Sequence, residues 1–262
     1  MALHYAGCAS QGARSYQEDR AAILTGAGEE VPVSQGRAGS APELTVALAD
    51  GMGGHAGGAV ASEIACRAYL KATAAASGDL PARLDAALAE ANAAIAEHVA
   101  SHPQLNGMGC TLVGAAFGAF GIAWVSVGDS PLYLVRAGKI EQLNEDHSLA
   151  PEIDKLAAAG KISLAEARAD PRRHFLRSAL TGSAPELIDR RQRPLPLEPN
   201  DIIVVASDGI GTLTPEEILA TVAAQPSAGA EAMAMALLAA VDAKGEAYQD
   251  NTTIVVVRVG TS

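Results

Sequence analysis

The stretch LTVALADGMGGHAGG, residues 44–58, decides how the rest of the chain is interpreted. Its first half is an apolar run of strand length that ends at Asp50, and its second half is dominated by glycine. Short apolar runs bounded by Asp and Gly are typical of buried strands that lead into turns. The stretch therefore predicts a buried strand with a carboxylate at its end.

Three further aspartates stand in the same kind of position. Asp129 ends the run IAWVSVGD, Asp208 ends DIIVVASD, and Asp250 precedes the run TTIVVVRV. Each one alone is more often a plain turn residue. As a set they are more informative, because strand ends are rigid and can hold several carboxylates at the distance of metal ligands. Oxygen ligands without nearby Cys or His favour Mg²⁺ or Mn²⁺ over zinc.

Another acidic pair lies earlier in the chain, in ARSYQEDR (residues 13–20). Glu18 and Asp19 follow Arg14 closely. One arginine together with bound cations can neutralise a phosphate ester, so the group suits phosphate chemistry. The simpler interpretation of Arg14 is a surface salt bridge to Glu18 or Asp19.

The remaining pattern outlines the fold. The run PLYLVRAGKIEQLN turns at Ala137 and Gly138, which predicts antiparallel pairing of its strands. Helical stretches come in two pairs, which would cover the outer faces of stacked antiparallel sheets. The predicted helices are residues 59–76, 81–99, 215–223 and 228–243, a loop is predicted at 26–42, and short helices around a turn at 145–177.

Composition excludes several classes of protein. The 262 residues are 49% hydrophobic and 19% charged, which supports an extended core and excludes wholesale disorder. A formal net charge of −11 opposes non-specific binding to nucleic acid or to an anionic membrane. Three cysteines without Cys-x-x-Cys spacing support neither a disulfide framework nor a thiolate zinc site, and they fit a reducing cytoplasm.

The uncharged stretch at residues 109–128 has the length of a membrane span. Gly118 and Ala119 divide it into the runs TLVGAAF and GIAWVSV, and no Lys or Arg flanks it as an anchor. The stretch therefore predicts a buried β-hairpin.

Seven segments, taken in their order along the chain, resemble the metal-dependent type 2C Ser/Thr protein phosphatases, especially their short bacterial members. The glycine-rich segment alone is moderately specific, whereas the full set in family order covers nearly the whole chain. The segments are ARSYQEDR (13–20), LADGMGGHAGG (48–58), GCT (109–111), VGDSPLY (127–133), NEDHS (144–148), ASDG (206–209) and QDNTT (249–253).

The resemblance implies an α+β fold, a four-layer αββα sandwich formed as one domain over residues 1–262 with a variable flap at about 145–177. The implied cofactors are two Mn²⁺ or Mg²⁺ ions and a weaker third. In that family a central aspartate bridges two metals and the next glycine offers its carbonyl, which corresponds to Asp50 and Gly51. Glu18, Asp208 and Asp250 would complete the ligand set of the second metal, Asp129 would bind the third, and Asp19 would act through ordered water.

The resemblance also implies a mechanism: direct hydrolysis of phosphoserine or phosphothreonine by a metal-activated water, without a phosphoenzyme. Arg14 would hold the phosphoryl oxygens through bidentate hydrogen bonds. Met52 stands where many eukaryotic relatives have a histidine. His55, three residues later, either donates a proton to the leaving oxygen or only orders the glycine-rich turn.

The flap holds a basic cluster in an otherwise acidic protein. This cluster is either a solvated charged loop or a docking surface for acidic or multiply phosphorylated substrates. Its members are Arg168, Arg172, Arg173 and Arg177.

Two further features have structural interpretations. His98 and His102 have the spacing of a zinc pair, but Pro103 ends the predicted helix, and a solvated helix end is favoured. Cys110 stands in place of a threonine common in the family and is expected to pack as a small hydrophobe.

The expected protein is a cytoplasmic, monomeric phosphatase of signal transduction, with phosphorylated proteins as substrates, a cognate Ser/Thr kinase, and no nucleic-acid or membrane partner. The alternative is a catalytically silent phosphopeptide-binding or regulatory module on the same fold. The presence of Glu18, Asp50, Asp208 and Asp250 argues against this alternative, because a silent module is free to lose metal ligands.

Overall fold

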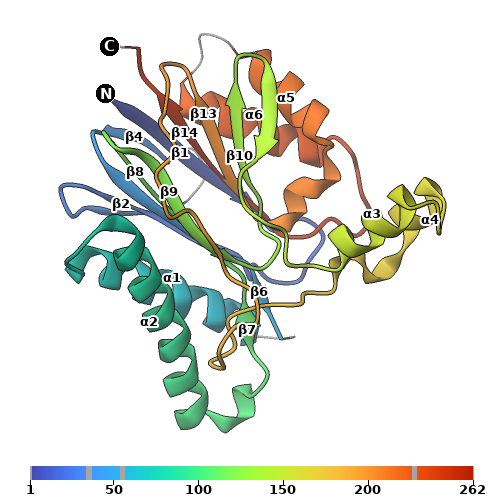
Figure 1. Ribbon diagram of the computed structural model, residues 1–262, viewed down its shortest axis with the longest axis horizontal. Helices are drawn as coiled ribbons and strands as arrows, with labels where there is room; N and C mark the ends of the chain where they lie inside the picture. The colour runs from blue at the N-terminus through green and yellow to red at the C-terminus, as the bar shows by residue number, and fades with distance from the viewer. Residues whose placement is uncertain (1, 34–36, 54–56, 226–228, 262) are drawn as a thin grey trace.

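Two six-stranded antiparallel sheets form the centre of the protein (Figure 1). The computed structural model describes residues 2–33, 37–53, 57–225 and 229–261. The first sheet has the order β11 (Lys139–Gln142), β10 (Leu132–Arg136), β13 (Ile202–Ala206), β14 (Thr252–Val259), β1 (Leu3–Ser10) and β4 (Arg37–Ala41). The second has the order β12 (Asp189–Arg190), β9 (Gly121–Val127), β8 (Leu112–Gly118), β5 (Leu44–Ala49), β2 (Arg20–Thr25) and β3 (Glu30–Pro32). A short ribbon pairs β6 (Gly51–Met52) with β7 (Gly109–Cys110).

Helix pairs cover the outer faces of both sheets. The helices α1 (Gly57–Ala75) and α2 (Leu80–Ser101) pack on the second sheet, and α5 (Pro215–Ala223) and α6 (Ala230–Asp242) pack on the first. Two short 3₁₀ turns, Pro103–Leu105 and Asp208–Thr212, follow α2 and β13. The predicted αββα sandwich is therefore confirmed, and the four long helices lie within a few residues of their predicted positions.

The helix ends follow their local sequence. Thr214 accepts a hydrogen bond from the Glu217 amide, and the Glu217 side chain accepts one from the Thr214 amide, which starts α5 with a capping box. Asp79 caps α2 through the amide of Ala82. These caps satisfy amides that would otherwise lack partners at the helix starts.

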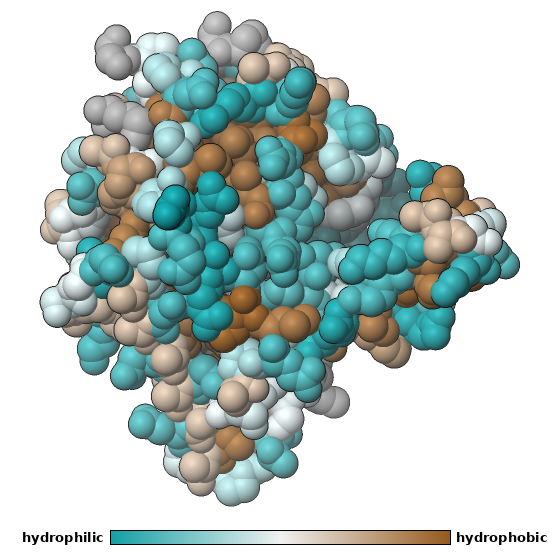
Figure 2. Space-filling model, in the orientation of Figure 1, coloured by the Kyte–Doolittle hydropathy of each residue, from teal (hydrophilic) through white to brown (hydrophobic). Residues whose placement is uncertain are grey.

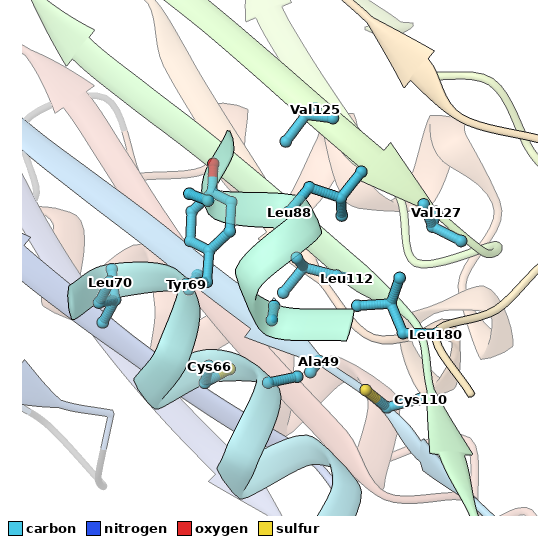
Figure 3. Close-up of a cluster of buried hydrophobic side chains, with 14 of the residues drawn as sticks. Ala49, Cys66, Tyr69, Leu70, Leu88, Cys110, Leu112, Val125, Val127 and Leu180 are labelled. Atoms are coloured by element: carbon cyan, nitrogen blue, oxygen red, sulfur yellow. The ribbon is translucent and has the colours of Figure 1, made fainter. Parts of the chain in front are cut away.

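Three apolar layers hold the sandwich together. The middle layer, between the sheets, is filled by residues such as Leu48, Val113 and Val255. Figure 3 shows part of an outer layer, where Tyr69 and Leu88 of the helices pack on the second sheet. All six residues of β5 are buried because both faces of the sheet are covered. Burial of one such large side chain contributes about 1.5–3 kcal/mol.

The stretch at 109–128 forms the predicted hairpin, with β8 and β9 buried along their whole length. No helix in the described ranges is both long and apolar enough to cross a membrane. All three cysteines are free and buried, and Cys110 packs in the apolar cluster of Figure 3 as expected.

Part of the predicted loop at 26–42 is strand instead. β3 pairs with the edge of β2, and β4 pairs with β1. Both are short edge strands in which most of the described side chains are exposed or half-buried, so they leave no strong apolar pattern in the sequence.

The segment between β11 and β12 projects from the sandwich (Figure 1). It contains α3 (Ala150–Ala158), α4 (Leu164–Ala169) and a 3₁₀ turn at Pro171–His174. The part of this segment at about 145–177 is called the flap, and its short helices were predicted. Its last turn leads directly to one wall of the cavity described next.

Candidate active site

The four strand-end aspartates meet at one edge of the sandwich. Asp50 follows β5 and Asp129 follows β9 of the second sheet, whereas Asp208 follows β13 and Asp250 precedes β14 of the first. All four line one cavity of about 870 Å³, together with Glu18. The two sheets therefore contribute carboxylates to a common cavity.

Backbone contacts fix Glu18 against the glycine-rich turn. Its amide donates to Oδ1 of Asn251 at 2.7 Å, and its carbonyl accepts from the amide of Gly51 at 3.2 Å. Only glycine fits at position 58, because a Cβ there would lie 2.8 Å from the backbone carbonyl carbon of Gly51 as well as 2.3 Å from Oε1 of Glu18. The glycine-rich sequence thus permits the carboxylate of Glu18 to approach the backbone after Asp50.

Asp50 is held by a residue that the sequence analysis did not single out. The amide of Asp50 donates to Oγ1 of Thr111 at 2.9 Å, and the amide of Thr111 donates to the carbonyl of Asp50 at 2.9 Å. Oγ of Ser130 lies 2.8 Å from the same Thr111 hydroxyl. The signals were the GCT and GDS segments, because Thr111 directly follows the short strand β7 and Ser130 follows the strand-end Asp129.

Asp19 lies behind the cavity and does not line it. Its side chain is buried, and its Oδ2 accepts a hydrogen bond from the hydroxyl of Ser207 at 2.7 Å. Burial raises the pKa of Asp19 to about 7, although the Ser207 hydrogen bond opposes this rise. Its position suits a residue that acts on the site from behind the ligands.

The site holds more negative charge than the protein neutralises. Burial, followed by repulsion from Asp208, raises the pKa of Asp50 well above its usual range. Burial and the Asp208 charge also raise the pKa of Asp129 to about 8. The pKa values of Glu18 and Asp208 are raised as well, with burial as the largest cause. A site of this kind favours the binding of cations.

Carboxylate oxygens without partners support a metal site. Oε1 of Glu18, Oδ1 of Asp19 and Oδ1 of Asp208 are buried and have no hydrogen-bond partner. Such groups are costly unless a cation or water satisfies them. Within the described ranges, no three Asp, Glu, His or Cys side chains are arranged to hold an ion as they stand. The oxygen donors fit Mg²⁺ or Mn²⁺, and side-chain adjustment must complete the ligand set.

Arg14 lines the cavity, but its partner differs from the one considered in the sequence analysis. Its guanidinium forms an ion pair with Asp250 and not with Glu18 or Asp19. The side chain is about half exposed. It therefore presents donors to the cavity beside a proposed metal ligand.

The histidines are placed differently from one another. His55 lies outside the described residues. His98 and His102 stack at the end of α2, with ring centroids 4.2 Å apart, as expected for a solvated helix end. His174 lines the cavity from the flap and, with Arg14, opposes the rise that burial causes in the pKa of Asp208. Sequence analysis missed His174, whose only signal was its place inside the flap.

Three of the four flap arginines are bound to acidic partners of the flap itself. Arg173 pairs with Asp154 at 2.6 Å and Arg172 with Asp170 at 2.6 Å, and Arg177 pairs with Glu152. The flap arginines are therefore largely neutralised within the flap.

Comparison with known proteins gives the family. The Protein phosphatase 2C family matches residues 35–239. The chain is 39% identical over 178 residues to the serine/threonine protein phosphatase PstP of Mycobacterium tuberculosis, a match over 66% of this chain and 33% of PstP. The chain thus spans about a third of the length of that relative. It is also 36% identical over 176 residues to the serine/threonine phosphatase stp of Listeria innocua, covering 65% of this chain and 68% of that protein.

Solved structures agree. The crystal structure of the M. tuberculosis phosphatase PstP/Ppp superposes over the whole of both chains with a TM-score of 0.78 and 31% identity. The catalytic domain of PstP in complex with two manganese ions superposes with a TM-score of 0.76 and 30% identity, again over both whole chains. Fold, motif order and sequence identity agree, and the chain belongs to the protein phosphatase 2C family.

Proposed function

We propose that this chain hydrolyses phosphoserine and phosphothreonine on proteins with Mn²⁺ or Mg²⁺ as cofactor. One observation carries the proposal: of the six carboxylates and two arginines that line a single cavity among the described residues, five carboxylates and one arginine are those assigned from the sequence to metal or phosphate binding. The residues are Glu18, Asp50, Asp129, Asp208 and Asp250 with Arg14. The relative whose structure contains two manganese ions supports the choice of metal.

The metals would be held by residues that are already close to one another. Asp50 would bridge two ions, the carbonyl of Gly51 would add a ligand, and Glu18, Asp208 and Asp250 would complete the set. Asp129 would hold a third, weaker ion. When bound, such cations activate water and neutralise phosphate charge. The unpartnered oxygens of Glu18 and Asp208 fit this role.

Other side chains of the protein would bind the phosphoryl group, orient ordered water and donate a proton. Arg14 would donate two hydrogen bonds to the phosphoryl oxygens, and would exchange part of its contact with Asp250 for the substrate. Asp19, fixed by the Ser207 hydroxyl, would orient groups through ordered water. His55 remains a candidate proton donor to the leaving oxygen on sequence grounds alone.

The competing hypothesis is a catalytically silent phosphopeptide-binding module. Retention of the complete carboxylate set argues against it. The deciding experiment measures phosphate release from a phosphothreonine peptide with added Mn²⁺, with Mg²⁺, and with excess chelator. We expect turnover that requires added metal. Peptide binding without turnover under all three conditions would favour the silent module, and unchanged turnover in chelator, with metal removal verified, would reject the metal role.

We further propose that residues 1–262 act as one phosphatase domain, with the flap at about 145–177 beside its cavity. We place the protein in the cytoplasm, in signal transduction, as a monomer opposite a cognate Ser/Thr kinase. The buried free thiols and the acidic charge support this placement. A kinase encoded beside this chain, together with size-exclusion chromatography, would test the partner and the monomer.

A further inference from the structure

A second cavity lies next to the active-site cavity, along α2. Its volume is about 510 Å³. Leu88, Ala89 and Ala93 of α2 line one side, and Pro185 and Ile188 line the other. We call this cavity the α2 groove. Figure 2 shows apolar surface around the place where Figure 1 draws β6 and β7, between α2 and the flap.

The groove and the active-site cavity are adjacent and share a wall. Ala184 and Pro185 line both of them. A chain that places a phosphorylated residue in the active-site cavity needs to cross only this short segment to enter the groove. An extended chain spans roughly 3.3–3.6 Å per residue, so a few residues suffice.

The shared wall is held rigidly against α2. The side-chain amide of Asn92 makes two hydrogen bonds to the residues just before this wall. Its Oδ1 accepts from the amide of Gly182 at 2.9 Å, and its Nδ2 donates to the carbonyl of Ser183 at 2.8 Å. Gly182 has a φ of +87°, and a Cβ there would lie 2.8 Å from Cα of Ala96. The groove is therefore formed before any ligand arrives, which lowers the entropic cost of binding.

The unpaired charge beside the groove is negative. Glu97 lines the groove and Glu186 lines the active-site cavity next to Pro185. Neither carboxylate has an ion-pair partner in the part of the chain that the structure describes. The one arginine of the groove, Arg190, is bound to Asp85 at 2.6 Å. A basic ligand is thus complementary to this surface.

We propose that the α2 groove binds the part of the substrate protein that flanks the phosphorylated residue, taking up one apolar side chain and pairing a basic residue with Glu97. The inference rests on the proposed function, since it assumes that the phosphorylated residue occupies the active-site cavity. The apolar lining of the groove, its position beside the active-site cavity and the unpaired carboxylate of Glu97 all fit this part of the substrate. The preferred substrate is then an apolar-basic phosphopeptide, in contrast to the acidic substrates that the flap arginines suggested.

The test uses phosphothreonine peptides in which one leucine and one lysine are moved stepwise on either side of the phosphothreonine. For the best peptide, replacement of its leucine by alanine is expected to lower kcat/KM about tenfold or more, because an apolar pocket discriminates on that scale. Ala93→Trp fills the groove and Glu97→Lys reverses its charge. Each is expected to raise KM for that peptide about tenfold, with turnover of a small aryl phosphate within twofold of the original chain.

Matched controls lie on the same helix. Ala86 and Glu90 are exposed on α2 but do not line the groove. Ala86→Trp and Glu90→Lys are therefore expected to change neither KM for the peptide nor turnover of the aryl phosphate. Glu97→Lys is also expected to lower KM for a peptide whose lysine is replaced by glutamate. The groove proposal is overturned if Ala93→Trp changes the kinetics of the peptide and of the aryl phosphate equally, or changes neither.

Fluorescence anisotropy with the labelled peptide separates the two proposals. If the original chain with Mn²⁺ hydrolyses no ester, the phosphatase proposal fails, and the groove is still decided by whether Ala93→Trp and Glu97→Lys weaken peptide binding while Ala86→Trp and Glu90→Lys do not. Binding that is equal in all five proteins rejects the groove, whatever the activity.

Discussion

Arg14 forms an ion pair with Asp250, which lies 236 residues further along the chain. A hydrogen bond from the amide of Ala13 to the carbonyl of Gln249 and one from Nδ2 of Asn251 to the carbonyl of Gln11 hold the two segments together. Arg14 is the cationic side chain proposed to bind phosphate, and it is thus positioned by a proposed metal ligand. Loss of either residue should therefore affect both phosphate binding and metal binding.

We expect Arg14→Ala to lower kcat/KM for every phosphoester, including a small aryl phosphate. The expected loss is about 100- to 1,000-fold, the usual cost of one donor that stabilises developing charge. The matched control is Arg20→Ala, because Arg20 forms a similarly exposed ion pair with Glu63. Steady-state kinetics on a small ester and on a phosphopeptide decide the matter. Comparable losses in both variants would remove Arg14 from the reaction.

We expect Asp208→Asn to weaken metal binding and activity, because the change keeps the size of the side chain and removes a ligand charge. Replacement of residues behind a metal ligand already costs roughly 10- to 100-fold, so the loss of a ligand should cost at least as much. Calorimetric titration with Mn²⁺ and phosphate release are the two measurements, and Glu63→Gln is the surface control. Retention of most activity at saturating Mn²⁺ by folded Asp208→Asn would show that Asp208 is no ligand.

The raised pKa values predict how stability depends on pH. Asp19 and Asp129 titrate at about 7 and about 8 in the folded, metal-free protein, and near 3.9 when unfolded. The stability that their protons contribute is present at low pH and is lost as pH rises through the folded pKa values. Cations replace these protons, so the rise in Tm caused by Mn²⁺ should grow from about pH 6 to about pH 9.

Thermal melting with and without Mn²⁺ across that range measures the difference. Asp129→Asn removes one titrating group and should flatten the pH dependence of the metal-free protein. A rise in Tm that is constant with pH would mean that the site does not exchange protons for metal.

We expect Gly58→Ala to weaken Mn²⁺ binding about tenfold, because the new Cβ would displace the carboxylate of Glu18. Gly57→Ala is the matched control, since among the described residues its Cβ would meet only Cβ of Met108, at 3.3 Å. Both changes raise helix propensity by up to about 1 kcal/mol. A Cβ on Gly58 would also lie 2.8 Å from the backbone carbonyl carbon of Gly51, so thermal melting of the Gly58→Ala protein must accompany the comparison of metal affinities. Equal metal affinities of the two variants would contradict the close approach.

The flap should respond as a unit. Arg173 ties the turn that carries His174 to α3 through Asp154, so the pair Arg172→Ala with Arg173→Ala should loosen a wall of the cavity. We expect its effects on an acidic phosphopeptide and on a small ester to agree within about threefold, because exposed ion pairs of this kind contribute little docking energy. A loss confined to the acidic peptide and relieved by salt would restore the docking hypothesis.

Sequence predicted the parts of this fold whose signals are local. Buried strands such as β5 and β14 have both faces covered, so they read as continuous apolar runs. β3 and β4 escaped notice because edge strands lack such runs. The four aspartates were found through their strand-end positions, and Glu18 and Asp19 as an acidic pair near Arg14. The Arg14–Asp250 pair, the Thr111 contact to Asp50 and the entry of His174 into the cavity depend on packing between distant segments.

The place of β14 within its sheet has a consequence for biosynthesis. β14 lies between β13 and β1, yet it leaves the ribosome after every other strand that the structure describes. Until residues 250–259 emerge, the sheet has a gap at its middle, β1 lacks its main partner, and the cavity lacks Asp250. A nascent chain therefore cannot complete the proposed ligand set early, and the candidate active site forms only after β14 has been synthesised.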